Sequence, residues 1–112
     1  MSSECEMGGR RALELFSKKW ALLTVYALFD GTKRLSELQR EIDGVSQKML
    51  IQTLRELESK GLVEREVHPV VPPHVDYTLT PAAEALRDPL LELCEWGKMH
   101  LPLSVDEPLV AR

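Results

Sequence analysis

Residues 46–60 give the strongest helix signal in the chain, and the segments beside them restrict what the chain can fold into. Ser46 is a residue type that favours the N-cap of a helix, and Gly61 is typical of the position just past a helix end. A shorter helix is predicted over about 35–42, a few residues upstream. Apolar and polar side chains then alternate over 62–68, which predicts a strand. Two helices joined by a tight turn and followed directly by a strand leave few architectures open.

A second alternating segment completes a hairpin. Residues 75–79 alternate between apolar and polar side chains and predict a second strand. The segment 69–74 between the strands contains three prolines, which lack the N–H that a strand ladder needs, so a stiff loop is predicted there. Pro81 suits the first turn of a last helix, which is predicted over 81–100 with a kink at Pro89.

Two further helices are predicted before this region, over 10–17 and 18–29. The second is apolar on most of its surface, so we expect it in the centre of the core. Gly31 follows it as a typical helix-ending residue. Residues 101–112 are predicted to be a loose tail.

The predicted order is four helices, a β-hairpin and a last helix, which is typical of a winged helix-turn-helix. A chain of 112 residues is long enough for one such domain and not for two. We therefore predict a single, mainly α-helical domain over 1–112 with a small β-hairpin. Its helix-turn-helix lies at about 35–60, its wing at about 62–80 and its C-terminal helix at about 81–100. Such domains place the second helix of the motif in the major groove of DNA.

Composition excludes several other classes of protein. With 44% hydrophobic and 29% charged residues, the balance is that of an ordinary globular domain. No apolar run approaches the roughly 18 residues of a membrane span, and the polar start of the chain does not resemble a signal peptide, so we expect a cytoplasmic protein with no membrane partner. No phosphate loop, nucleophile–base pair or metal-ligand spacing is recognisable, so we expect no enzyme activity, no cofactor and no metal.

Charge is unevenly distributed along the chain. The net charge is −4 at pH 7. Residues 1–60 hold 10 Lys and Arg against 9 Asp and Glu, whereas residues 61–112 hold 4 against 9. The acidic total argues against DNA binding but does not exclude it, because a local cationic face is enough to bind phosphate.

One face of the 46–60 helix carries the side chains that DNA reading requires. A helical wheel places Leu50, Leu54 and Leu57 on the buried side. The N-terminal half of the helix contains no acid, and its candidate DNA-binding residues are Ser46, Gln47, Lys48, Ile51, Gln52 and Arg55. Cations near phosphates and Gln or Arg near base edges are what groove entry needs. The alternative is an ordinary solvated helix face.

Three candidate DNA contacts lie outside this helix, at Arg34, Arg65 and His74. Arg34 either contacts the DNA backbone or is an ordinary surface charge. Arg65 either reaches a sugar-phosphate or pairs with Asp76 across the hairpin. His74 and His68 flank the wing tip and either touch phosphate or are solvated. We expect no metal between them, because a third ligand is not evident and the loop is stiffened by prolines.

The run over residues 18–86 resembles the HxlR family of bacterial transcriptional regulators, winged-helix relatives of the MarR group. The motifs that carry the resemblance are KW at 19–20, RLSEL at 34–38, SQKML at 46–50, LRELESKGLVER at 54–65, PVVPPHVDYTLT at 69–80 and CEWG at 94–97. The resemblance covers roughly residues 5–100. It implies a small cytoplasmic repressor or activator that dimerises through its N- and C-terminal helices. It also implies a cysteine upstream of the KW motif that senses oxidants or electrophiles, and Cys5 lies in that region.

The residues around Cys5 leave its reactivity open. We expect Cys5 to be exposed, a few residues before the first helix. Nearby Arg10 and Arg11 and the helix dipole favour the thiolate, whereas the adjacent glutamates disfavour it. The resemblance implies a redox role for Cys5, and the alternative is an inert thiol. Cys94 is expected to be buried on the C-terminal helix, with a redox role as its alternative.

Apolar residues on the terminal helices predict a homodimer. The last helix carries more apolar side chains than one small core can cover, and the first helix adds others, so both are expected at an interface. The predicted function is therefore a dimeric regulator that binds double-stranded DNA and responds to an oxidant or a small molecule. The alternative is a winged-helix module that binds proteins and not DNA.

Overall fold

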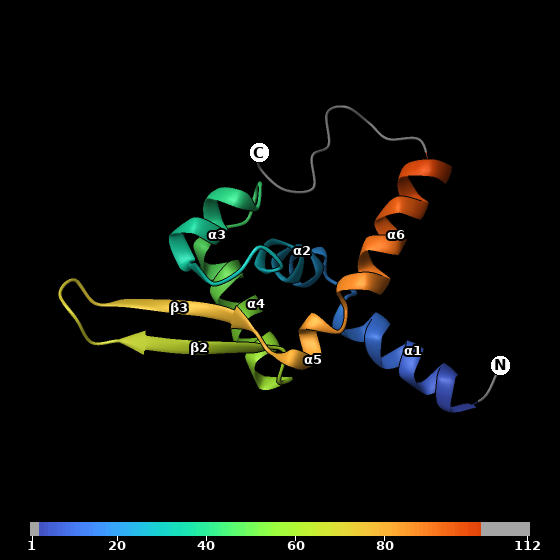
Figure 1. The fold of residues 1–112 in the computed structure, drawn as a ribbon, viewed down its shortest axis with the longest axis horizontal. Coiled ribbons are helices and arrows are strands. Elements are labelled where there is room, and N and C mark those ends of the chain that lie inside the picture. Colours follow the sequence, from blue (N-terminus) through green and yellow to red (C-terminus); the bar gives the residue numbers. More distant parts are fainter. Residues whose placement is uncertain (1–2, 102–112) are drawn as a thin grey trace.

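The computed structural model describes residues 3–101, and its elements follow the predicted order with two additions (Figure 1). The helices are α1 (Ser3–Leu15), α2 (Lys19–Leu28), α3 (Leu35–Glu41), α4 (Gln47–Ser59), α5 (Pro81–Glu84) and α6 (Arg87–His100). The strands are β1 (Lys33–Arg34), β2 (Val63–His68) and β3 (His74–Leu79). Among these residues no helix combines the length and the apolar character needed to cross a membrane.

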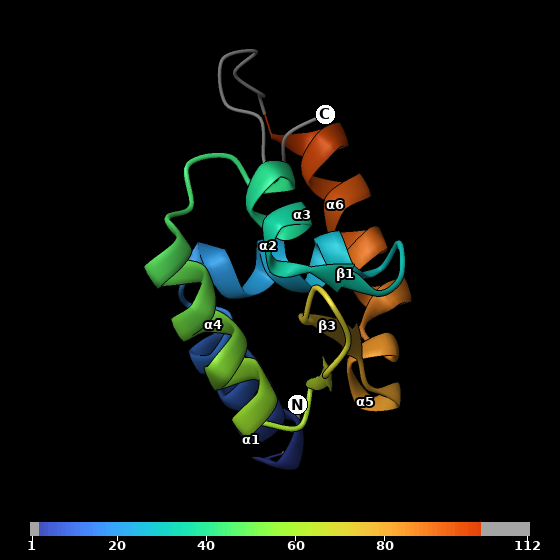
Figure 2. The ribbon, with the colours of Figure 1, turned by 90° about the vertical axis from the view of Figure 1, so that its left-hand side faces the viewer.

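The core is built around α2. This helix buries most of its residues and packs against both α4 and β3 (Figure 2). The largest fully buried apolar side chains come from α2, from α3 with the turn after it, and from α4, and they are Val25, Leu28, Leu38, Ile42, Leu50, Leu54 and Leu57. The apolar helix α2 therefore lies in the centre of the core, as predicted. The side of α4 predicted to be buried is the side that is buried.

Local signals at both ends of α4 are confirmed. The Ser46 hydroxyl accepts a 3.1 Å hydrogen bond from the backbone N–H of Met49, as expected of an N-cap. Gly44, in the turn before α4, has φ +84°, and Gly61, just after α4, has φ +76°. Residues other than glycine rarely adopt a backbone conformation with positive φ. The turn between α3 and α4 and both ends of α4 are thus formed by residue types that suit those positions.

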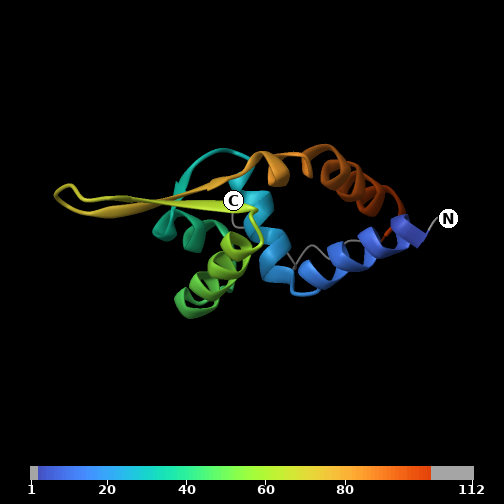
Figure 3. The same ribbon diagram turned by 90° about the horizontal axis from the view of Figure 1, so that it is seen from below.

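The sheet has three strands and not two. Its antiparallel order is β1-β3-β2, with Arg34 of β1 opposite Asp76 and Lys33 opposite Tyr77. The predicted hairpin is confirmed, although β3 begins at His74, one residue earlier than expected. The β2–β3 hairpin extends from the helical body as a wing (Figures 1 and 3).

The helix boundaries differ from prediction at both ends of the chain. The first helix starts at Ser3 and not near residue 10, so Cys5 lies in the first turn of α1 and not before it. The last helical region is split into α5 and α6, with a break at Ala85 and Leu86. The expected kink at Pro89 is wrong, because Pro89 falls in the first turn of α6, where a missing N–H removes no intrahelical hydrogen bond. The predicted tail over 101–112 lies, apart from its first residue, outside the described residues.

The two terminal helices lie at the end of the molecule opposite the wing (Figures 1 and 3). No residue of α1 is buried, and Leu90 is the buried residue of α6. Both helices therefore present most of their surface to solvent in the single chain.

Candidate nucleic-acid interface

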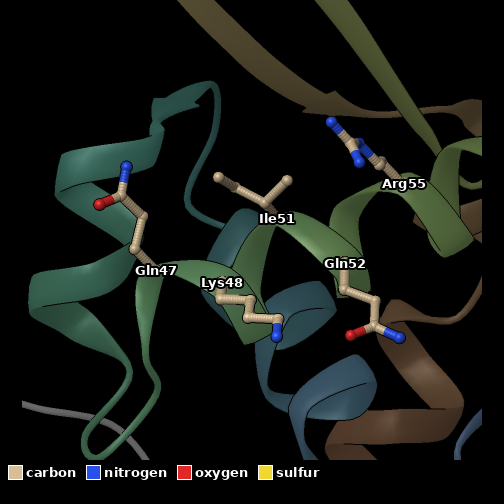
Figure 4. Close-up of a pocket in the computed structure, with 5 residues that line it drawn as sticks. All are labelled: Gln47, Lys48, Ile51, Gln52 and Arg55. Carbon is tan, nitrogen blue, oxygen red and sulfur yellow. The ribbon is translucent and has the colours of Figure 1, made fainter.

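The exposed face of α4 gathers five of the predicted site residues. Together they line one open pocket: Gln47, Lys48, Ile51, Gln52 and Arg55 (Figure 4). Ile51 is half-buried and the other four are exposed. The first turn of α4 contains no acidic residue, so the positive end of the helix dipole and the Lys48 ammonium are not opposed there by a carboxylate of the helix. This surface combines positive charge, two amide side chains and one apolar contact.

Ser46 has a structural role beside this surface. Its hydroxyl oxygen is the N-cap acceptor for the N–H of Met49. The cap fixes where α4 begins, and so fixes the positions of Gln47 and Lys48 that follow it. A predicted contact residue therefore also positions its neighbours.

Arg65 lies beside the α4 surface on the wing. It lines a small pocket together with Ile51, Arg55, Glu58 and Tyr77. The predicted alternative that Arg65 pairs with Asp76 is wrong, because the register places Arg65 opposite Tyr77. Instead, Nε of Arg65 lies 3.9 Å from Oε2 of Glu58. The guanidinium is half exposed, so the wing adds a cation next to the Arg55 end of the α4 surface.

Glu58 and Tyr77 were not recognised from the sequence as neighbours of Arg65. Tyr77 is buried, and this burial raises the pKa of its phenol above the ordinary value of 10.0, while the positive charge of Arg65 acts in the opposite direction. The phenol is therefore neutral at physiological pH. The strand register brings Tyr77 opposite Arg65, and a prediction of that register would have been the signal for it. Glu58 comes from α4, and its approach to Arg65 depends on how the helix packs against the wing.

Arg34 and His74 lie on the opposite face of the sheet from Arg65. Successive strand residues point to opposite faces, so Arg34, His74 and Asp76 share one face while Arg65 and Tyr77 share the other. Nε of Arg34 lies 4.0 Å from Oδ1 of Asp76, and Nε2 of His74 lies 3.9 Å from the same oxygen. These two predicted residues are therefore grouped around a carboxylate and not with the α4 surface.

A possible metal-binding group occurs on this second face. His68, His74 and Asp76 each offer one ligand atom, and these atoms all lie within 4.8 Å of one another. The expectation that the two histidines have no third ligand is wrong, because Asp76 follows His74 by two residues on β3 and so points to the same face.

Both cysteines are exposed, Cys5 in the first turn of α1 and Cys94 in α6. The burial expected for Cys94 is absent from the single chain and would require a partner against α6. Large apolar side chains are also exposed on both terminal helices, namely Leu91, Leu93, Trp96 and Met99 on α6 and Met7 and Leu13 on α1.

Comparison with known proteins places this geometry in a family. A family model described as HxlR-like helix-turn-helix matches residues 15–105. The chain is 44% identical over 93 residues to YtfH of Escherichia coli K12, an uncharacterized HTH-type transcriptional regulator, and the match covers 83% of this chain and 74% of YtfH. The reduced form of the transcriptional regulator YodB from B. subtilis has a TM-score of 0.76 at 38% identity, covering 90% of this chain and 95% of YodB. The redox regulator HypR in its oxidized form has a TM-score of 0.76 at 37% identity, covering 86% of this chain and 99% of HypR.

Proposed function

The chain belongs to the HxlR-like helix-turn-helix family of DNA-binding transcriptional regulators, and from this premise we propose that it acts as a homodimer whose α4 helices enter the major groove of two half-sites. The family assignment confirms the resemblance inferred from the sequence, the winged helix-turn-helix fold and the expectation that the chain is not an enzyme. The residues that contact DNA, the dimer and the signal are parts of the proposal.

The observation that carries the proposal is the acid-free, exposed N-terminal face of α4. Lys48 and Arg55 supply positive charge for phosphates. Gln47 and Gln52 supply amide groups of the kind that pair with adenine edges, and Ile51 supplies an apolar surface for a thymine methyl. Arg65 extends this surface onto the wing, while Arg34 and His74 are assigned to phosphate contacts from the other face of the sheet.

The exposed apolar side chains of α1 and α6 support the dimer. Leu13 is 73% exposed and Trp96 is 52% exposed in the single chain. Patches of this kind in a small protein mark an interface, and a two-fold axis through it would set two α4 helices about 34–36 Å apart, one turn of DNA.

We also propose that the protein receives a redox or electrophile signal at Cys5. The exposed position of Cys5 in the first turn of α1 supports it, since an exposed thiol is accessible to oxidants and electrophiles. HypR, which resembles this chain over most of its length, is described as a redox regulator. Because α1 is also assigned to the dimer interface, a modification there would act on the spacing of the two α4 helices.

The experiment that tests DNA binding starts from the genome that encodes the chain. Duplex fragments retained by the protein are selected and sequenced, and the affinity for the selected duplex is measured by fluorescence anisotropy over a range of salt concentrations. We expect a palindromic site and a linear fall of log affinity with log salt concentration, because bound counterions are released. A chain that retains no fragment, or binds every duplex equally, is not a sequence-specific regulator.

A further inference from the structure

Four side chains that can bind a metal share one face of the wing. The register pairs His68 with His74 and Glu66 with Asp76 across the hairpin. Residues two apart on a strand point to the same face, so both pairs lie side by side on the face turned away from Arg65. The two imidazole rings are stacked, with centroids 4.6 Å apart and planes inclined by 23°.

The Asp76 carboxylate lies beside the Nε2 atoms of both imidazoles. Its Oδ2 is 2.9 Å from Nε2 of His68, and its Oδ1 is 3.9 Å from Nε2 of His74. Nε2 of His68 is buried from solvent, yet within residues 3–101 it has no partner in hydrogen-bonding geometry. An unprotonated imidazole nitrogen and a carboxylate oxygen both offer lone pairs. A cation bound to both groups would use these lone pairs as ligands.

We propose that His68, His74 and Asp76 bind a divalent first-row transition-metal ion of the zinc class. Imidazole nitrogens with a carboxylate oxygen form a donor set that suits such ions. Two ligand atoms about 2.1 Å from a tetrahedral ion lie about 3.4 Å apart, a value between the two separations observed here. Small side-chain rotations are therefore enough to complete the site. Glu66, whose Oε1 lies 3.9 Å from Nε2 of His68, or a water molecule takes the fourth position.

The ion would link the two strands of the wing and change the charge of this face. His68 ends β2 and His74 begins β3, so the metal links the two strands at the base of the Pro-rich tip. The register places three carboxylates on this face, Glu64, Glu66 and Asp76, and one cation, Arg34, so these four side chains carry a net charge of −2. A bound divalent ion neutralises that charge. If the wing approaches phosphates, as the proposed function holds, the ion increases DNA affinity.

Cobalt(II) and zinc(II) titrations of the full chain, without DNA, test the site itself. We expect one equivalent of Co²⁺ per chain, with visible d–d absorption bands that Zn²⁺ abolishes. Sulfur-to-cobalt charge-transfer bands are not expected, because Cys5 and Cys94 are not ligands. On Zn²⁺ addition, the ring resonances of His68 and His74 should shift in NMR spectra, while those of His100 should not.

His68→Gln and His74→Gln are the diagnostic variants, and His100→Gln is the matched control on α6. Each ligand variant should weaken Co²⁺ binding more than about tenfold, whereas the control should bind as the wild type does. Circular dichroism of the three variants checks that they fold alike. The site is refuted if His74→Gln retains full affinity, or if the bound Co²⁺ shows thiolate charge transfer.

The effect of the metal on DNA binding is measured separately, as the affinity for the selected duplex with and without Zn²⁺. Zn²⁺ should tighten binding of the selected duplex severalfold in the wild type. His74→Gln also lacks a proposed phosphate contact, so its affinity is compared with and without Zn²⁺, and that ratio should be one. Metal binding with no change in DNA affinity would overturn the charge argument while leaving the site established. Failure to bind DNA at all, with metal still bound, would instead refute the proposed function and not the metal site.

Discussion

The side-chain hydroxyl of Thr80 donates a 2.7 Å hydrogen bond to the backbone carbonyl of Gly61, and so ties the end of the wing to the end of α4. The same hydroxyl oxygen accepts a 3.4 Å hydrogen bond from the N–H of Ala83, as the N-cap of α5. One side chain therefore links the end of the wing to the end of α4 and also caps the segment that leads to α6.

Thr80→Val should destabilise the fold while keeping the shape of the side chain. It removes one hydrogen bond and one N-cap, so the free energy of unfolding should fall by about 1–2 kcal/mol. Urea denaturation with an unchanged m-value measures this loss. Thr32→Val is the control, because it removes an exposed hydroxyl pair with Thr78 and should cost less than about 0.5 kcal/mol. Equal losses in both variants would show that Thr80 has no special role.

Lys48→Ala and Arg55→Ala should each weaken DNA binding and flatten its salt dependence. Removing one phosphate contact lowers the slope of log affinity against log salt concentration by about one unit. Lys60→Ala, at the opposite end of α4, removes the same charge away from the proposed surface and should leave the slope unchanged. If all three variants behave alike, the positive charge of α4 acts only at long range.

Gln52→Ala should alter sequence preference more than overall affinity. Its amide is exposed on the α4 surface, between Lys48 and Arg55, where it can make a bidentate contact to a base (Figure 4). The loss is expected at one base pair per half-site, at a cost of about 1–3 kcal/mol. Anisotropy with single-base variants of the selected duplex measures it. A uniform loss across all duplexes would reassign Gln52 to the DNA backbone.

Local chemistry explains which parts of the fold were predictable. The extent of α4 follows from the helical spacing of its apolar residues, from the Ser46 cap and from the glycine after it. All of these signals lie within one short stretch of the sequence. The two-residue strand β1 has no period of its own, since it exists only through pairing with β3. The start of α1 was missed because Gly8 and Gly9 lower the helix propensity of that segment.

The same distinction applies to the candidate site. The α4 surface was predictable, because a helical wheel orders residues by sequence alone. The position of His74 was not, because a one-residue difference in register moves every strand side chain to the other face. The pairing of β2 with β3 sets Tyr77 opposite Arg65 and His68 opposite His74, two residues before Asp76, and neither grouping is visible without the register.

Trp96→Ala should shift the protein toward monomers. The wild type is expected to give about twice 12.7 kDa by light scattering at micromolar concentration. Truncating a large, half-exposed aromatic side chain removes an anchor of the kind that dominates interfaces. Val71→Ala is the control, since Val71 is 98% exposed at the wing tip and far from α6. A wild type that is monomeric and still binds DNA with full affinity would refute the dimer.

Cys5→Ser should abolish the response of DNA binding to oxidants. Peroxide would convert the Cys5 thiolate to a sulfenic acid with release of hydroxide, and a second thiol would then displace water to form a disulfide. That thiol would be Cys94 of either subunit or the partner's Cys5. The linked dimer would hold its α4 helices at a changed spacing, so operator affinity would change.

The experiment titrates the wild type, Cys5→Ser and Cys94→Ser with peroxide or a quinone while anisotropy reports DNA binding. Non-reducing electrophoresis in parallel detects a covalent dimer. The wild type should respond and Cys5→Ser should not, while the behaviour of Cys94→Ser identifies the second thiol: loss of the disulfide assigns it to Cys94, and a persistent covalent dimer assigns it to the partner's Cys5. If wild type and Cys5→Ser respond alike, or neither responds, Cys5 is not the sensor and the signal enters at another site.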